Sequence, residues 1–127
     1  MPIFTHVTVG TNDLGRARTF YDRILAPLGI SRVKDLGDNG SIWGQGGPEF
    51  FVLKPADGGP ATHANGGTIS FAAPNRAAVA AFHEAALAAG AKDEGAVGPR
   101  SWAPNAFAAY VRDLDGNKLA AYSFTEE

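Results

Sequence analysis

The chain of 127 residues repeats one pattern at an interval of about 62 residues, and this repeat constrains its fold more than any other feature. The segment 20–25, FYDRIL, recurs as 82–87, FHEAAL. A short segment with strand-like alternation precedes each copy, at 5–9 and at 67–71. Two copies of one structural unit predict a pseudo-symmetric domain, with a cleft between the copies. The residues that line this cleft then decide the function.

The first copy predicts a strand, a helix and three further strands. A period-two strand covers 3–9, and Asn12 and Asp13 are candidate caps for a helix whose apolar stripe ends at Gly29. Three short apolar segments follow, separated by the glycines and polar residues that turns require. These predicted strands are 32–36, 41–44 and 50–53.

The second copy predicts the same order of elements. Pro74 and Asn75 precede its helix, and Gly90 ends it. A tight turn at 113–117 joins the last two strands, and its spacing does not match that of a calcium-binding loop. The predicted elements are a strand at 68–72, a helix at 76–89, and strands at 92–97, 107–112 and 118–124.

We therefore predict one α+β domain made of two βαβββ units in tandem, which form a mixed-sheet cleft. Unit one covers about 1–56, a Gly/Pro-rich linker about 57–66, and unit two about 67–127. A sheet with one helix leaves its other face bare, so two such units gain stability by bringing these faces together or by pairing with another chain. A chain of 127 residues is long enough for one domain with a sizeable core.

Strand alternation assigns side chains to the two faces of each predicted sheet. In the first strand, His6 and Thr8 point to one face and Val7 and Val9 to the other. In the second unit, Thr68 and Ser70 correspond to the polar set. We expect the apolar sets to pack on the helices and the His, Thr and Ser side chains to face the cleft.

Composition excludes several classes of function. The formal net charge is −2, and the charged residues are dispersed, so no basic face is present for nucleic acid or anionic lipid. The chain has no cysteine, no apolar stretch near 18 residues and no leader-like segment at its start. These features predict no nucleic-acid partner, no membrane partner and a cytoplasmic location. Neither a nucleophile elbow nor a phosphate-binding loop is present.

The chain resembles the glyoxalase/bleomycin-resistance/extradiol-dioxygenase group, which is the vicinal oxygen chelate superfamily. The resemblance rests on the paired βαβββ units, the FYxxxL-type helix, His6 in the first strand and the turn at 113–118 before the last strand. It covers essentially the whole chain. It implies a site between the two sheets where a divalent metal is commonly held by histidine, glutamine and glutamate side chains and polarises the substrate's vicinal oxygens.

Three of the four metal-ligand positions implied by the resemblance hold residues that do not coordinate metals well. His6 occupies the first position, Thr68 the corresponding position of unit two, Ala120 the last-strand position of unit two, and Phe51 that of unit one, with a register uncertainty of one residue. One imidazole does not retain a divalent metal in competition with water. The resemblance therefore implies a degenerate metal site and no cofactor.

A divalent metal remains an alternative if other side chains have rebuilt the site. Glu49 lies two residues before Phe51, and His63 lies in the linker, so a set of His6, Glu49 and His63 is conceivable. Without a metal, the imidazole of His6 can orient a polar ligand or act as a base. His83 lies on the apolar side of its helix, where we expect packing and a hydrogen bond to a strand or loop.

Aromatic and hydroxyl side chains provide the other candidate ligand contacts. Trp43 and Tyr110 occupy matched positions in the two units and are expected to flank the cleft, and Trp102 and Asn105 are candidates for a lid. Core or dimer packing is the competing interpretation of the tryptophans. The full set of candidate ligand-binding residues is Thr8, Trp43, Phe51, Thr68, Ser70, Trp102 and Tyr110.

Two functions from different classes remain open. The first is a small-molecule-binding protein of the glyoxalase/bleomycin-resistance type with a degenerate metal site. The second is a glyoxalase-like lyase or isomerase that uses His6 with a rebuilt or partial metal site. A third interpretation is a degenerate relative whose pocket is filled by its own side chains and that pairs with another chain. The resemblance also implies a homodimer.

Overall fold

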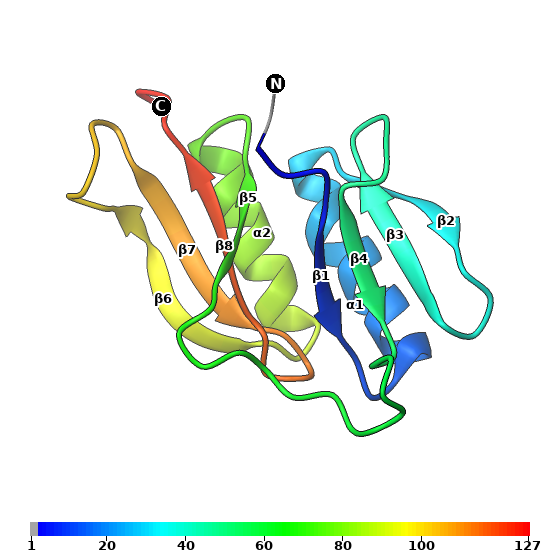
Figure 1. Ribbon diagram of the computed structural model, residues 1–127. Coiled ribbons are helices and arrows are strands. Elements are labelled where there is room, and N and C mark those ends of the chain that lie inside the picture. Colours follow the sequence, from blue (N-terminus) through cyan, green and yellow to red (C-terminus); the bar gives the residue numbers. More distant parts are fainter. Residues whose placement is uncertain (1–2) are drawn as a thin grey trace.

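The chain forms two four-stranded sheets, each covered by a helix, and the two units stand side by side (Figure 1). A computed structural model describes residues 3–127. The first unit contains β1 (Val7–Gly10), α1 (Leu14–Leu25), η1 (Ala26–Leu28), β2 (Ser31–Asp35), β3 (Gly40–Gly44) and β4 (Phe50–Leu53). The second unit contains β5 (Ile69–Ala72), α2 (Arg76–Ala88), β6 (Lys92–Pro99), β7 (Phe107–Arg112) and β8 (Lys118–Ser123). This α+β architecture of two tandem units is the one that the sequence predicts.

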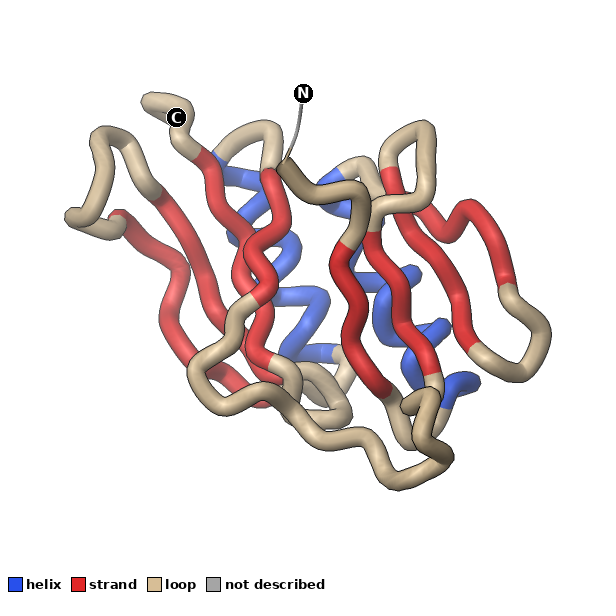
Figure 2. The backbone as a smooth tube through the Cα atoms, viewed as in Figure 1, coloured by secondary structure: helices blue, strands red, loops and turns tan. Residues whose placement is uncertain are grey.

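The two sheets have the same topology. Their strand orders are β1-β4-β3-β2 and β5-β8-β7-β6, and in each sheet the first strand pairs in parallel with the last strand of its unit. The other neighbours pair antiparallel. Both helices lie on the same side of the molecule, so each sheet keeps one face without a helix, which we call its open face (Figure 2). Strands β1 and β5 meet at the centre (Figure 1).

The first strand is shorter than the alternation predicts. It begins at Val7, because its partner β4 begins at Phe50 and the first pairing residue is Val7. The prediction of a strand from Ile3 is therefore wrong, and His6 lies just before β1 and not within it. The remaining predicted elements match observed ones with ends that differ by a residue or two, which is the usual uncertainty at element boundaries.

Both helices begin at the side-chain caps that the sequence predicts. The carboxylate of Asp13 accepts a hydrogen bond from the backbone N–H of Arg16 at 3.1 Å, and the amide oxygen of Asn75 accepts one from Ala78 at 2.8 Å. Each cap satisfies a backbone donor that has no partner within the helix. After η1 the chain turns at Gly29, whose φ of 77° lies in the left-handed region that glycine adopts without strain.

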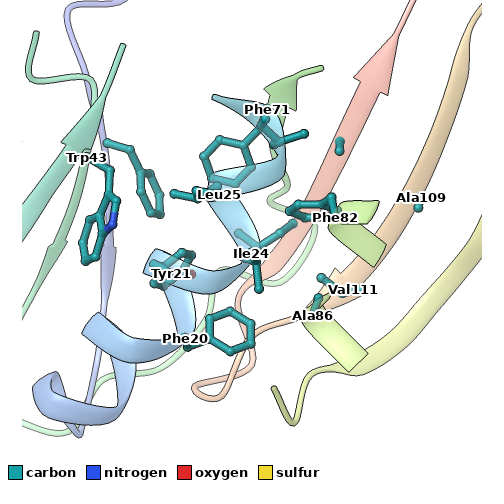
Figure 3. Packing of buried hydrophobic residues seen from close by; sticks show 14 of the residues in the cluster. Phe20, Tyr21, Ile24, Leu25, Trp43, Phe71, Phe82, Ala86, Ala109 and Val111 are labelled. Atoms are coloured by element: carbon teal, nitrogen blue, oxygen red, sulfur yellow. The ribbon is translucent and has the colours of Figure 1, made fainter. Parts of the chain in front are cut away.

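One apolar core extends across both units (Figure 3). The two helices contribute Tyr21, Ile24 and Phe82, which are at most 1% exposed, and Phe71 of β5 packs edge-on against Phe50 of β4. Each large apolar side chain buried in this way stabilises the fold by about 1.5–3 kcal/mol. Because the core is shared, the two units are held in one relative arrangement.

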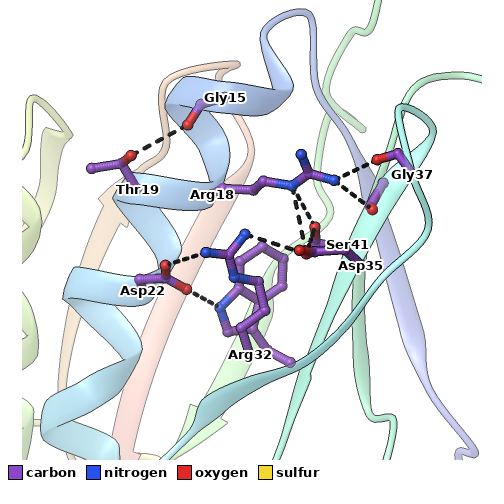
Figure 4. Close-up of polar contacts among 10 residues, drawn as sticks. Gly15, Arg18, Thr19, Asp22, Arg32, Asp35, Gly37 and Ser41 are labelled. Atoms are coloured by element: carbon purple, nitrogen blue, oxygen red, sulfur yellow. Dashed lines mark hydrogen bonds and ion pairs between the residues drawn. The ribbon is translucent and has the colours of Figure 1, made fainter.

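Charged side chains hold α1 against the outer strands of the first sheet (Figure 4). Arg18 donates to the hydroxyl of Ser41 at 2.7 Å, and Ser41 donates to Asp35 at 2.6 Å. Arg32 of β2 lies between Asp22 and Asp35, at 3.0 and 3.2 Å. The hydrogen bond from Ser41 lowers the pKa of Asp35, and Arg32 and Arg18 lower it further. The helix and the sheet edge are therefore joined by charge as well as by apolar packing.

The turn between β7 and β8 fastens unit two to unit one through polar contacts that we call the inter-unit bracket, made of Thr11, Asn12, Tyr21, Asp113 and Asp115. The carboxylate of Asp115 accepts hydrogen bonds from the Thr11 hydroxyl at 2.6 Å and from the Asn12 backbone at 2.9 Å. The buried hydroxyl of Tyr21 donates to Asp113. The bracket lies just after the C-terminal end of β1, at one end of the seam between β1 and β5.

Within residues 3–127, no helix has the length and apolar character that crossing a membrane requires.

Candidate functional site

The seam between β1 and β5 is the place where the two units offer side chains to a common space. Val7 and Val9 of β1, with Ile69 and Phe71 of β5, pack towards the helices as part of the shared core. Thr8 and Ser70 point the other way and are exposed. The predicted separation of apolar and polar faces is therefore present in these strands, and polar side chains line the open side of the seam.

His6 stands at one end of this seam. Its ring stacks on Phe51 of β4, with 4.4 Å between the ring centroids and 29° between the ring planes. The Thr5 hydroxyl lies 2.9 Å from His6 Nδ1, so this hydrogen bond orients the imidazole. The side chain is exposed, and its position at the seam makes it available to a molecule bound there.

A hollow of about 270 Å³ opens beside His6, between the start of β1 and strand β5. Its walls are mainly apolar and include Ile30, Phe50 and Phe71, which belong to the core or pack against it. The polar groups at the hollow come from both units and the N-terminal segment. They are Thr5, His6, Gln45, Glu49 and Ser70. A largely apolar hollow with a few polar groups is typical of a small-molecule site.

The metal-ligand positions implied by the resemblance do not form a coordinating set. Phe51 presents an aromatic ring to His6, and Thr68 lies just before β5 and is exposed. Ala120 lies on β8 opposite Ser70, is fully buried, and has no donor atom in its side chain. The donor set of these positions is one imidazole and one neutral hydroxyl, which does not fit the divalent metal implied by the family.

The alternative metal site of His6, Glu49 and His63 is wrong. His63 lies against Gly116 in the turn between β7 and β8, and Glu49 accepts a hydrogen bond from the backbone of Gln45 in the turn between β3 and β4. His6 and Glu49 share the hollow, but His63 is not part of it. Within the described range 3–127, no three His, Asp or Glu side chains come together as a metal site.

Trp43 and Tyr110, which are expected from the sequence to flank the cleft together, lie on opposite faces of their sheets, and of the two Trp43 lines the hollow. Trp43 is fully buried on the helix side of its sheet, where its indole N–H donates to Asp22 of α1 at 3.0 Å. Trp43 borders the hollow only from the core side. Tyr110 pairs with Ala120 and packs against residues of the open face of unit two. The two positions lie on opposite faces of their sheets because of strand register: Trp43 pairs with Phe50, which pairs with Val7 of the core face, whereas Ala120, the partner of Tyr110, pairs with the exposed Ser70.

His83 packs as the sequence predicts. Its imidazole is mostly buried on α2 and lies 3.1 Å from Asp93 at the start of β6. The hydrogen bond from His83 lowers the pKa of Asp93. The histidine therefore links a helix to a strand and is not part of the hollow at the seam.

The open face of unit two carries an aromatic cluster, which we define as Trp102, Tyr110, Tyr122 and Phe124. The hydroxyls of Tyr110 and Tyr122 are hydrogen-bonded to each other, and the indole N–H of Trp102 donates to Tyr122 at 3.0 Å. Burial and the Tyr122 hydroxyl raise the pKa of Tyr110 to about 12. Tyr122 and Phe124 were not among the predicted site residues, although the alternation through Lys118 and Ala120 places Tyr122 on this face.

Trp102 and Asn105 occupy the loop between β6 and β7, where the sequence predicts a lid. Asn105 has a φ of 60°, which is uncommon for a residue other than glycine and marks a tight turn. Under the loop, Ala106, Ala108 and Ala120 are at most 1% exposed. Trp102 itself remains 67% exposed, with its ring packed edge-on against Tyr122 and Phe124. The loop therefore covers part of the open face and presents an indole to solvent.

The chain matches the family model of the Glyoxalase/Bleomycin resistance protein/Dioxygenase superfamily over residues 3–121. It belongs to this superfamily, as the repeat and the strand order already indicate.

Among solved structures, a glyoxalase/bleomycin resistance protein from Albidiferax ferrireducens T118 is 38% identical, with a TM-score of 0.85, over 95% of this chain and 98% of that chain. Another is the E126Q mutant of the fosfomycin resistance protein FosX from Listeria monocytogenes, complexed with Mn(II) and 1S,2S-dihydroxypropylphosphonic acid. It is 16% identical with a TM-score of 0.70, and the match covers 100% of this chain and 94% of that chain. Lactoylglutathione lyase from Agrobacterium tumefaciens is 21% identical with a TM-score of 0.66, and the match covers 96% of this chain and 94% of that chain. No curated protein matches the chain.

Proposed function

We propose that this chain is a small-molecule-binding protein of the glyoxalase/bleomycin-resistance type that binds its ligand at the seam without the metal site of the family. One observation carries the proposal: the imidazole of His6 stacks on Phe51, at the position where the family pattern calls for a second metal ligand. An aromatic ring there provides apolar contact area to a bound molecule and no electron pair to a metal.

The hollow beside His6 supports the same proposal. Its volume of about 270 Å³ lies just below the range of about 300–1,000 Å³ for small-molecule pockets. Apolar walls supply burial, and the side chains of His6 and Ser70 supply hydrogen bonds that orient a polar group. A compact ligand with an apolar body and one or two polar atoms suits this combination.

Metal content and thermal melting test this proposal. Protein purified without chelator or nickel resin should contain metal far below one equivalent, and Zn²⁺, Mn²⁺, Fe²⁺ and Ni²⁺ should leave the melting temperature within about 1 °C. A compound from a small-molecule library that binds at the seam should raise the melting temperature, and His6→Ala should reduce this rise. The matched control is His63→Ala, which changes a histidine outside the hollow. Near-stoichiometric metal that is lost in His6→Ala would contradict the proposal.

A glyoxalase-like lyase or isomerase is the second candidate function. The observation that favours it is the exposed imidazole of His6, which the Thr5 hydroxyl holds in place beside the hollow. A neutral imidazole with a fixed orientation has the properties of a general base. Turnover of the hemithioacetal of methylglyoxal and glutathione, with and without added metals, tests this candidate. Turnover that disappears in His6→Ala and persists in His63→Ala would show that the protein is an enzyme and would contradict the binding-only proposal.

We also propose that the chain forms a homodimer in the cytoplasm. The proposal of a cytoplasmic location rests on the composition. The proposal of a dimer rests on surface that is exposed at a sheet edge and on the open face of unit two. Strand β2, at the outer edge of the first sheet, is exposed along its whole length, and Trp102 and Phe124 expose aromatic surface on the second unit. A second copy would cover such surfaces. Sedimentation equilibrium should give twice the chain mass of 13.2 kDa, and a value of one chain mass would contradict the dimer.

A further inference from the structure

On the open face of unit two, one hydroxyl donor lacks an acceptor among the described residues, and two cations lack an ion-pair partner of their own. In the aromatic cluster, the two hydroxyls of Tyr110 and Tyr122 hold two protons, and only one of them lies between the two oxygens. Tyr122 also accepts the indole N–H of Trp102. Within residues 3–127 the second phenol proton has no acceptor, so the cluster presents one spare O–H donor.

Two cations stand over the ring of Tyr110, one of the two phenols. The guanidinium carbon of Arg100 lies 5.4 Å from the centroid of the Tyr110 ring, and Lys118 Nζ lies 5.2 Å from it. Over the described residues, neither cation forms an ion pair within 4 Å, whereas the neighbouring Arg112 is paired with Glu94 at 2.6 Å. The hydrogen bond from Arg112 lowers the pKa of Glu94, and the charges of Arg112, Lys92 and Lys118 lower it further, so this one carboxylate is shared among three cations. Arg100 uses its terminal N–H groups on backbone carbonyls of its own loop. Its charge is therefore not neutralised by an acidic side chain, although the chain as a whole is acidic.

The same place exposes flat apolar surface. Trp102 is 67% exposed and Phe124 is 51% exposed, and their ring centroids lie 5.7 Å apart. Exposed aromatic rings near cations that have no carboxylate partner of their own suit a molecule that combines a planar apolar body with a negative group. A phenol with the ordinary pKa of 10.0 is already protonated at neutral pH, and burial raises the pKa of Tyr110 further, so its hydroxyl remains a donor.

We propose that the aromatic cluster, with Arg100 and Lys118, is a binding site for planar aromatic acids. The carboxylate is received by the spare phenol O–H and the two cations, and the ring system lies against Trp102 and Phe124. This inference rests on the proposed function for the premise that the protein binds small molecules, and it adds the chemical class of ligand and a location distinct from the hollow at His6.

Nuclear magnetic resonance of the ¹⁵N-labelled full chain tests the proposal, because the chain has only two tryptophan indole N–H groups. Trp102→Phe assigns the Trp102 signal, and the signal of Trp43, which lines the hollow at His6, reports separately on binding there. The probes are 2-naphthoate and its uncharged counterpart 2-naphthamide. We expect 2-naphthoate to shift the Trp102 signal saturably, with an affinity at least about fivefold higher than that of 2-naphthamide.

Three variants separate charge from structure. Lys118→Gln and Arg100→Gln should each weaken binding of 2-naphthoate by about threefold or more and leave 2-naphthamide unchanged. Arg100 also supports its loop, so Lys118→Gln is the variant that removes charge without changing loop contacts. Arg23→Gln, on an exposed position of α1, is the matched control and should leave both affinities unchanged.

Equal affinity for the two probes, unchanged binding in Lys118→Gln, or an unshifted Trp102 signal at millimolar 2-naphthoate would each overturn the inference. The proposed function is tested separately by the ring signals of His6 in the same samples. If 2-naphthoate moves the His6 signals and not the Trp102 signal, the seam is supported as a site and the site proposed on unit two is overturned. If no compound in the library moves the His6 signals or raises the melting temperature, the proposed function fails.

Discussion

The side chains at the family's metal-ligand positions determine which contacts a ligand can make at the seam. Phe51 gives His6 an aromatic face in place of a carboxylate, and Ala120 is enclosed by the alanines and tyrosines of the open face. His6 was predicted as a cleft residue from its place in the alternating segment 3–9. The stack on Phe51 was not predictable, because it depends on how far β4 extends beside β1.

We expect the loss of a single atom, the hydroxyl oxygen of Tyr21, to destabilise the fold. In Tyr21→Phe the buried ring remains, but Asp113 loses a buried hydrogen bond, which should cost about 1–3 kcal/mol of unfolding free energy. Urea denaturation measures this change. Tyr110→Phe is the matched control: it also removes a hydroxyl, but one bonded to a neutral phenol at the open face, and should cost less than Tyr21→Phe. Equal losses in the two variants would contradict the buried role of Tyr21.

The pH dependence of stability should carry the signature of Tyr21. Burial, and then the charge of Asp113, raise the pKa of Tyr21 well above its ordinary value of 10.0. The folded state therefore keeps a proton that the unfolded chain loses, so this contribution is complete below about pH 10 and declines as the pH rises further. The unfolding free energy of the native chain should fall more steeply between pH 10 and 11 than that of Tyr21→Phe. Parallel curves for the two proteins would show that the tyrosine hydroxyl is not buried.

At the scale of elements, local sequence signals explain the helices and most strands. Asp13 and Asn75 cap the helices as predicted, and the period of the apolar residues matches the buried face of α1. The errors occur where an element depends on a neighbour distant in sequence. The first strand starts late because β4 begins at Phe50, and Trp43 faces the helix because β3 pairs it with Phe50, a core residue of β4.

The turn between β3 and β4 should tolerate a methyl group at one glycine and not at another. A Cβ on Gly44 would stand 1.7 Å from the carbonyl oxygen of Gly47, whereas a Cβ on Gly47 meets no atom within 4 Å. Gly44→Ala should therefore lower the unfolding free energy by about 2 kcal/mol or more, because the turn must open. Gly47→Ala is the control and should change it by less than about 0.5 kcal/mol. Urea denaturation of both variants decides, and similar losses would contradict the close approach of the two glycines.

For the whole molecule, the arrangement of the units depends on the shared core and on the inter-unit bracket. The core joins both helices and the inner faces of both sheets (Figure 3). The bracket joins the turn at Asp115 to the residues that precede α1. Together they determine how β1 and β5 face each other, and thus the shape of the hollow at His6.

Removing Asp115 should weaken this arrangement without separating the units. Asp115→Ala loses hydrogen bonds from Thr11 and from the Asn12 backbone, and should cost about 1–3 kcal/mol of unfolding free energy. Because the core is shared, we expect thermal unfolding to remain a single transition. Asp38→Ala, in the exposed turn between β2 and β3, is the control and should be close to neutral. Two separate transitions in the native chain would show that the units unfold independently.

The sequence by itself determined the α+β class, the tandem units, the helix caps and the alternation of faces, because these depend on residues a few positions apart along the chain. It also determined that the family's metal-ligand positions hold His6, Thr68, Phe51 and Ala120, since residue identity settles whether a side chain has a donor atom. Only the tertiary structure decided that Trp43 is buried, that His63 lies away from His6, and that Trp102, Tyr110, Tyr122 and Phe124 form one cluster. These outcomes depend on packing between strands and loops far apart in sequence, and local periodicity carries no information about such contacts.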